Sequence, residues 1–281
     1  MTHIPPVPTL DHVVINVRDR IDDGADTYRR LGFTLTPRGY HSLGSMNHLA
    51  IFGTDYLELI AAPPGDTKRP EILGSPEGLN GLVFGTDDSA GVYAALVAAC
   101  VPALEPRAFT RPVELSDGPH DAAFRTVRLP EGTVPDGRLY FCHHLTRDLV
   151  WRDEWRHHAN GVVGVAQAVI MATDPGRWRS LFERMFGVEA VHAIPGGCAL
   201  TVGLSSFEVV TPDVLAARFG SAAPDAGGRT DMMAALSFRT RSLDQAAAAL
   251  AAGGIAGVRR EAGRIIVPAS AAFGAAIAFV E

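Results

Sequence analysis

Two segments of the chain each place one ionisable side chain in an apolar, strand-like context. The segment LDHVVINVRD (residues 10–19) contains His12, and the segment DYLELIAAPP (residues 55–64) contains Glu58. Successive side chains of a strand point to opposite faces, so each of the two residues shares a face with mainly apolar neighbours. A carboxylate on the inward face of such a strand is costly unless it is paired or bound to a cation. These residue types indicate coordination of a divalent metal, or general-base chemistry by the carboxylate.

A third candidate is the histidine pair that ends the segment RLYFCHH (residues 138–144). Because strand side chains alternate, only one of His143 and His144 can face the interior. The pattern alone leaves both open, and we prefer His144.

Each candidate also has an ordinary structural explanation. A single histidine in a strand is most often a hydrogen-bonded core residue, and this holds for His12. Glu58 taken alone would suit the exposed face of an edge strand. What favours a metal site is the occurrence of all the candidates at matching positions of a repeated unit.

The elements that would position these side chains recur along the chain. Residues 10–62 have the pattern of a strand, a helix and three strands, the first of these three being FTLTPRG (residues 33–39). The same order begins again near residues 79, 164 and 234, although each of these copies shows only two strands after its helix, in the second copy after a proline-rich stretch. The sequence predicts an α+β fold of four βαβββ modules, which form two paired-module domains. We place the domains at residues 1–156 and 157–281, because a polar, histidine-rich segment separates the second and third copies.

Composition limits the location and the partners of the protein. The 281 residues are 47% hydrophobic and 20% charged, and 25 basic against 31 acidic residues give a net charge of −6. Without a basic block, nucleic acid and anionic membranes are not expected partners. Three cysteines, far apart and odd in number, indicate a reducing compartment, and MTHIPPVPTL has no signal-peptide pattern. We expect a cytoplasmic protein with a small-molecule substrate, and a homodimer is left open.

The unit formed by LDHVVINVRD, YRRLGF and YLELI resembles the vicinal oxygen chelate superfamily, and more narrowly its glyoxalase-like domain proteins. Two further segments are similar to sequences of this group, GYHSLGSMNHL and YFCHHLTRDLVWRDEW. The resemblance is clearest over residues 9–62 and 138–156, and it covers the second half only weakly. It implies paired βαβββ modules whose sheets curl around a central cavity, where many members hold a divalent metal.

The resemblance also implies a set of metal ligands. The matching positions fall on His12, Glu58 and His144, whereas Gly81 stands where a classical glyoxalase I has a histidine. Three ligands are therefore expected here instead of four. Two imidazoles and one carboxylate suit Fe(II), Mn, Zn or Ni and leave positions open for substrate. Such a metal can polarise a carbonyl or stabilise an enediolate, with Glu58 as the catalytic base.

Further polar residues are candidates for a substrate pocket. They are His41, Asn47, His48, Tyr56 and His143. A turn histidine, a turn asparagine and a solvent-facing strand histidine are the ordinary explanations of the first three.

Two hypotheses on function follow from these residues. The leading one is a metal-dependent lyase, isomerase or ring-cleaving dioxygenase that acts on a small oxygen-rich molecule. The alternative is a non-catalytic small-molecule binding protein of the bleomycin-resistance type, favoured by Gly81 and by the degenerate second half. In that half Glu208 matches Glu58, but Gln167 stands where the first module has His12. We therefore expect the C-terminal domain to be free of metal.

Overall fold

The computed structural model describes residues 5–115 and 117–281, so the first four residues of the segment examined for a signal peptide lie outside it. Residues 5–156 contain two βαβββ modules. The first consists of β1 (Leu10–Asn16), α1 (Ile21–Arg30), β2 (Gly39–Tyr40), β3 (Met46–Ile51) and β4 (Tyr56–Ala61). A short helix, α2 (Pro70–Gly74), leads to the second module, which consists of β5 (Gly78–Gly85), α3 (Ser89–Ala98), β6 (Arg107–Leu115), β7 (Gly118–Arg128) and β8 (Arg138–His144).

The same order of elements returns twice in the second half. The third module consists of β9 (Val162–Ala172), α4 (Pro175–Phe186), β10 (Val191–Ile194), β11 (Gly197–Val202) and β12 (Ser205–Val210). After α5 (Pro212–Phe219), the fourth module consists of β13 (Asp231–Thr240), α6 (Leu243–Ala252), β14 (Arg259–Glu261), β15 (Arg264–Val267) and β16 (Ala276–Val280). The predicted fold class, α+β with four modules, is confirmed.

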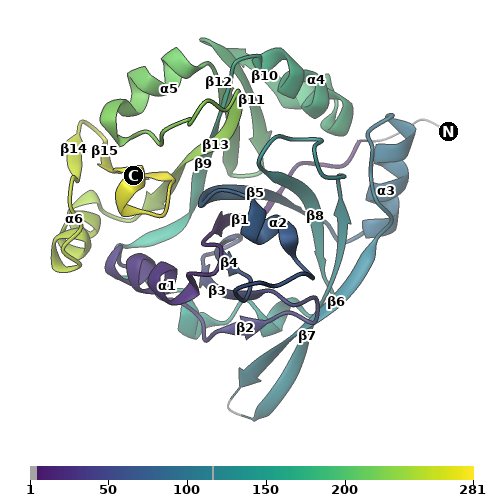
Figure 1. Cartoon of the computed structure of the whole chain (residues 1–281), viewed down its shortest axis with the longest axis horizontal. Helices are drawn as coiled ribbons and strands as arrows, with labels where there is room; N and C mark the ends of the chain where they lie inside the picture. Colours follow the sequence, from purple (N-terminus) through teal and green to yellow (C-terminus); the bar gives the residue numbers. More distant parts are fainter. Residues whose placement is uncertain (1–4, 116) are drawn as a thin grey trace.

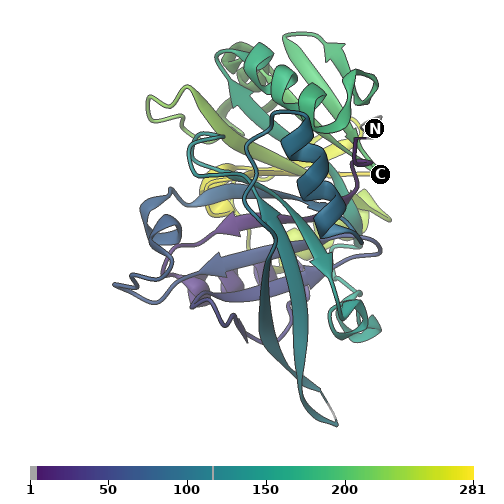
Figure 2. The same cartoon turned by 90° about the vertical axis from the view of Figure 1, so that its right-hand side faces the viewer.

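The modules pair into two curled sheets of eight strands with the same topology. The strand orders are β2-β3-β4-β1-β5-β8-β7-β6 and β10-β11-β12-β9-β13-β16-β15-β14. In each sheet the first strands of two modules pair antiparallel at the centre, and each first strand also pairs parallel with the last strand of its own module. The two sheets lie one above the other in Figure 2, and the β6–β7 hairpin extends away from the body of the molecule (Figure 1).

One predicted strand is wrong, and three observed strands, β6, β10 and β14, were not predicted. The expected strand at residues 33–39 is wrong, since pairing begins only at Gly39 and β2 is two residues long. Strand β6, which contains Pro112, was not predicted because of the proline-rich composition around it. It lies at the edge of the sheet, where a proline without an N–H group is tolerated.

The first sheet has two buried faces with different neighbours. Val13, Ile15, Leu57 and Leu59 belong to a core that continues into the second half of the chain. The opposite face belongs to a separate cluster that contains Val14, Tyr56 and Ile60. Both halves contribute residues to the larger core. The division into two domains, at residues 1–156 and 157–281, stays a prediction.

Helix α1 is amphipathic and covers part of this larger core. Its Ile21, Ala25 and Tyr28 are buried, which is the spacing of one helical face. The Tyr28 hydroxyl donates to the carbonyl of Ala272, 3.3 Å away, and so joins the helix to the C-terminal half.

None of the described helices is long and apolar enough to cross a membrane. The cytoplasmic location and the homodimer stay predictions.

Asp55 links the two sheets through a buried carboxylate. Its Oδ1 accepts a hydrogen bond from the backbone N–H of Val165 in β9 at 2.8 Å, and its Oδ2 accepts one from the Thr54 hydroxyl at 3.1 Å. Burial raises the pKa of Asp55 from 3.8 to about 6. The folded protein therefore binds this proton more tightly than the unfolded chain does.

This raised pKa predicts a pH-dependent contribution to stability. A carboxyl group with a higher pKa in the folded state stabilises the fold at low pH, and that contribution is lost as the pH rises from 3.8 to about 6. At about 1.4 kcal/mol per pKa unit, the loss amounts to at most about 3 kcal/mol. We expect the unfolding free energy of the wild type, minus that of Asp55→Asn, to fall over this interval in urea titrations. A difference that does not change with pH would contradict the assignment.

Candidate active site

The inner face of the first sheet encloses a cavity of about 820 Å³. Its lining includes apolar residues such as Ile60 and Phe124, together with an unusual number of charged and polar side chains. Both His12 of β1 and Glu58 of β4 are among them. Because β1 and β4 are adjacent parallel strands, these two predicted site residues lie side by side in the wall of the cavity.

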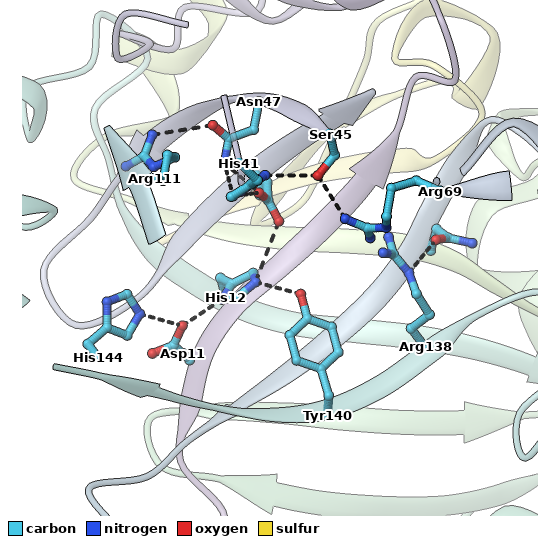
Figure 3. Close-up of polar contacts among 12 residues, drawn as sticks. Asp11, His12, His41, Ser45, Asn47, Arg69, Arg111, Arg138, Tyr140 and His144 are labelled. Atoms are coloured by element: carbon cyan, nitrogen blue, oxygen red, sulfur yellow. Dashed lines mark hydrogen bonds and ion pairs between the residues drawn. The ribbon is translucent and has the colours of Figure 1, made fainter. Parts of the chain in front are cut away.

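His12 and Glu58 face each other closely enough to act on one atom. The His12 Nε2 atom lies 3.6 Å from Glu58 Oε2 and 3.0 Å from the hydroxyl of Tyr140 in β8 (Figure 3). The imidazole also stacks on the ring of Tyr56, with 4.4 Å between ring centroids. Tyr56, a predicted pocket residue, thus lines the cavity and holds the imidazole in place.

Asp11 fixes the orientation of His12. Its Oδ1 lies 2.5 Å from His12 Nδ1. The register of β1 against β5 shifts between Leu10 and His12, so a β-bulge brings the carboxylate beside the imidazole that follows it. Burial by itself raises the pKa of Asp11, but the imidazoles of His144 and His12 outweigh it and hold that pKa well below its usual range. An ionised Asp11 keeps the imidazole proton on Nδ1, so the Nε2 atom that faces the cavity carries no proton.

His144 is brought to Asp11 and not to Glu58. Its Nε2 atom lies 3.1 Å from Asp11 Oδ1. Together with Cys142 these residues form the one group of three His, Cys, Asp or Glu side chains, within the described part of the chain, whose ligand atoms lie within 4.8 Å of one another. Burial raises the pKa of the Cys142 thiol, which therefore stays protonated beside Asp11. In this group a hydrogen bond joins His144 to Asp11, and Cys142 lies beside them in the cavity lining.

Asn47 and His41 surround the other side of the Glu58 carboxylate. The Asn47 amide donates to Glu58 Oε1 at 2.6 Å, and His41 Nε2 lies 3.9 Å from the same oxygen. Burial raises the pKa of Glu58, but His12, His41 and the hydrogen bond from Asn47 outweigh it, so the net shift is downward. Burial lowers the pKa of His41 to about 4, so this imidazole is neutral at pH 7. Both residues line the cavity, as the sequence predicts for a pocket.

Two other predicted pocket residues lie elsewhere. His48 is on the opposite face of β3 from Asn47, and its Nδ1 lies 2.8 Å from the carbonyl of Thr36. His143 lines a second cavity of about 770 Å³, whose lining also includes His144 and Asp11. Neither belongs to the described lining of the first cavity. Strand alternation separates His48 from Asn47, which does line the first cavity.

Three site residues were missed from the sequence. Tyr140 shares the inward face of β8 with Cys142 and His144, so the alternation of RLYFCHH could have indicated it. Asp11 could not be found, because regular alternation would turn it away from His12. Arg111 of β6, only 3% exposed, donates from Nη1 to Asn47 Oδ1 at 3.3 Å, and it lies in a strand that was not predicted.

Two glycines make room for these contacts. A Cβ atom on Gly39 would lie 2.5 Å from both Arg111 Nη1 and Asn47 Oδ1. At Gly81, where a classical glyoxalase I has a histidine, a Cβ atom would lie 2.9 Å from the Val14 Cβ. The close packing of β5 against β1 therefore excludes a side chain at this position and explains the departure from the four-ligand pattern.

The donor atoms around His12 can be compared with the needs of a divalent ion. Ligand atoms lie about 2.0–2.2 Å from a zinc-like ion, so two neighbouring ligands are separated by up to about 4 Å. The 3.6 Å between His12 Nε2 and Glu58 Oε2 meets this condition, and the Tyr140 hydroxyl, 3.0 Å from the same nitrogen, is a third donor atom. The hydrogen bond from His12 Nδ1 to Asp11 is the support that metal-bound histidines usually have. The residues fit an open metal site with two strong protein ligands.

The equivalent place in the second half has a different chemistry. Glu208 of β12 forms an ion pair with Arg218 of α5, which neutralises the carboxylate that matches Glu58. Gln167 of β9 pairs in register with Ser206, as His12 pairs with Tyr56. The prediction of a metal-free C-terminal domain is in keeping with this ion pair, and it stays a prediction.

Comparison with known proteins agrees with the fold. A family model described as a glyoxalase-like domain matches residues 10–186, which include the whole first sheet. The chain belongs to the glyoxalase-like domain family, within the vicinal oxygen chelate superfamily. No curated protein matches the chain.

Solved structures with a similar fold have low sequence identity. A hypothetical protein from Staphylococcus aureus has a TM-score of 0.69 at 11% identity, covering 97% of this chain and 99% of that one. A mutant of 4-hydroxymandelate synthase from Streptomyces coelicolor has a TM-score of 0.58 at 13% identity, covering 99% and 93%. A xylose isomerase-like TIM barrel/4-hydroxyphenylpyruvate dioxygenase fusion protein has a TM-score of 0.61 at 13% identity, and this chain spans half of it. These likenesses concern the fold alone.

Proposed function

We propose that the protein is a metal-dependent enzyme, a lyase, isomerase or ring-cleaving dioxygenase, that acts on a small oxygen-rich molecule. The observation that carries the proposal is the buried pair of His12 Nε2 and Glu58 Oε2, 3.6 Å apart in the wall of a cavity of about 820 Å³. Buried ionisable groups that face a cavity are the usual mark of a reactive site. Membership of the glyoxalase-like domain family supports the same class of chemistry.

In this proposal a divalent ion is held by His12 and Glu58, with the Tyr140 hydroxyl as a third donor. The ion would be Fe(II), Mn, Zn or Ni, and when bound it would polarise a substrate oxygen. His144 was the third ligand expected from the sequence. Since its Nε2 lies at Asp11, we assign it the role of holding that carboxylate.

The side chains of the chain itself have separate parts in the proposed reaction. Glu58, kept ionised by its neighbours, accepts a proton from the substrate. Tyr140 stays protonated because burial raises its pKa, and its hydroxyl donates a hydrogen bond to the developing charge. Asp11 holds the tautomer of His12, and the neutral amide of Asn47 orients Glu58.

The proposal is tested first by metal binding. Titration of the chelator-treated chain with MnCl₂ and ZnCl₂ in a calorimeter is expected to give about one site. His12→Gln is expected to weaken binding by more than about 10-fold, because a side-chain amide is a weaker ligand than an imidazole. His144→Gln is the matched control and is expected to stay within a few-fold of the wild type. Equal losses in both variants would restore His144 as a ligand, and equal binding by wild type and His12→Gln would refute the site.

Turnover is tested on the metal-loaded chain with a panel of small 2-hydroxy acids, 2-oxo acids and catechols. Loss of a Cα–H signal by ¹H NMR in D₂O would indicate a lyase or isomerase, and oxygen uptake would indicate a dioxygenase. No metal-dependent change with any compound of the panel would favour the second candidate. This is a non-catalytic small-molecule binding protein, and its support is that, among the described residues, His12 and Glu58 form no group with a third His, Cys, Asp or Glu in which one ligand atom from each lies within 4.8 Å of the others.

A further inference from the structure

Three arginine side chains gather along the cavity lining. Arg69 precedes α2, Arg128 ends β7 and Arg138 begins β8. Burial is the main cause that lowers the pKa of Arg138, and the nearby positive charge of Arg69 lowers it further. The same two causes act on Arg128, where Arg107 also contributes. Like charges have therefore been brought together from three separate segments of the chain.

Two of these three charges have no acidic partner among the described residues. Arg69 pairs with Glu71, but within the described residues no carboxylate lies within 4.0 Å of the guanidinium of Arg128 or Arg138. Arg138 donates from Nε to Asn80 Oδ1 at 2.9 Å, while its buried Nη2 makes no hydrogen bond to a described residue. A buried N–H group without an acceptor costs free energy, and more so when the group is charged. The Arg138 side chain thus brings an unpaired positive charge to the cavity lining, while its Nη2 atom lies buried beneath that surface.

The arginines are held in place by neutral acceptors. The Asn80 amide donates to the carbonyl of Asp136 at 2.9 Å, so the side chain that anchors Arg138 is itself anchored. Arg69 donates from Nη1 to the Ser45 hydroxyl at 2.8 Å. Figure 3 shows Arg69 and Arg138 on the side of the site where Tyr140 and Ser45 lie. Arg138 is thus held by a neutral amide, whereas Arg69 is also held by its ion pair with Glu71, so the unpaired positive charges are those of Arg128 and Arg138.

We propose that Arg69, Arg128 and Arg138 bind an anionic oxygen group of the substrate, a carboxylate or a phosphate. The guanidinium group can donate two parallel hydrogen bonds to either anion. Its charge contributes most to the binding free energy where water is partly excluded. Arg138 and Tyr140 lie two residues apart on one face of β8, which is roughly 7 Å along the strand. An anion at the arginines therefore directs the rest of the molecule toward Tyr140, His12 and Glu58. This assignment rests on the proposed function and names the class of its substrate.

The test uses the chelator-treated chain, so that it does not depend on metal. Inorganic phosphate and succinate are titrated separately in a calorimeter at constant ionic strength, and saturable binding of at least one is expected. Arg138→Gln should weaken that binding by at least about tenfold, and Arg138→Lys less, since lysine keeps the charge but loses the fork. Arg125→Gln is the matched control, because Arg125 is exposed on the opposite face of β7 and the charge change is the same.

Each outcome decides between stated alternatives. Binding of phosphate alone indicates a phosphorylated substrate, binding of succinate alone indicates a carboxylic acid, and either supports the proposal. If Arg138→Gln does not fold, Arg128→Gln carries the test, since the Arg128 guanidinium makes no hydrogen bond to a described residue. Failure of both anions to bind, or unchanged binding in these variants, overturns the proposal. Anion binding without any metal binding would leave this inference standing and refute the proposed metal enzyme.

Discussion

Glu58→Gln is expected to lower the affinity for divalent metal by more than about 100-fold and to abolish metal-dependent turnover. The substitution keeps the shape of the side chain and an oxygen that accepts the hydrogen bond from Asn47. It removes the negative charge that offsets the charge of the ion, and it removes the proton acceptor. Loss of a residue that merely supports a ligand costs about 10–100-fold, and loss of a charged ligand costs more.

A calorimetric titration with MnCl₂ measures the first effect, and the ¹H NMR panel measures the second. Glu71→Gln is a suitable control for the metal affinity, because Glu71 is another carboxylate of the cavity lining but pairs with Arg69 instead of His12. Its metal affinity is expected to stay within a few-fold of the wild type. Metal affinity of Glu58→Gln equal to that of the wild type would mean that Glu58 is only a structural carboxylate held by Asn47.

Phe84→Ala is expected to destabilise the whole chain by about 3–5 kcal/mol. Phe84 of β5 is fully buried, and its ring centroid lies 5.2 Å from that of Phe141, 4.7 Å from Phe186 and 5.5 Å from Phe207. Since Phe141 belongs to the first sheet and the other two to the second half, the lost ring leaves a cavity between the halves. The loss therefore combines the transfer free energy of the ring with the cost of that cavity.

Urea denaturation followed by tryptophan fluorescence checks this expectation in both halves. Trp151 and Trp155 report on the first half, and Trp178 in α4 reports on the second. We expect one shared transition at lower urea concentration, with Phe84→Leu showing a smaller shift because part of the volume is kept. Two separate transitions, with only one moved by the substitution, would show that the halves unfold as independent domains.

Alternation and recurrence in the sequence are sufficient to predict the modules and the strand faces on which His12 and Glu58 lie. Period-two alternation assigned Leu57 and Leu59 to one face of β4 and Glu58 to the other, because burial of apolar residues selects the register of a strand. The recurrence of strand, helix and strands predicted the two paired sheets. His12, Glu58, Asn47 and His41 meet in the cavity because they lie on the inward faces of neighbouring strands, or next to them, in a single module.

Contacts between modules were decided only by the tertiary structure. Alternation allowed both Tyr140 and His144 on the inward face of β8, and the pairing of β5 with β8 brings Tyr140 to His12. The bulge at Asp11 places its carboxylate within hydrogen-bond distance of His144. A bulge is a local shift of register, and amino-acid composition does not predict it. The arginine cluster is decided in the same way, since Arg69, Arg128 and Arg138 come from segments up to 69 positions apart. Sequence patterns fix which face a residue takes within its own strand, whereas the partner it meets across the cavity depends on how distant strands are brought into register.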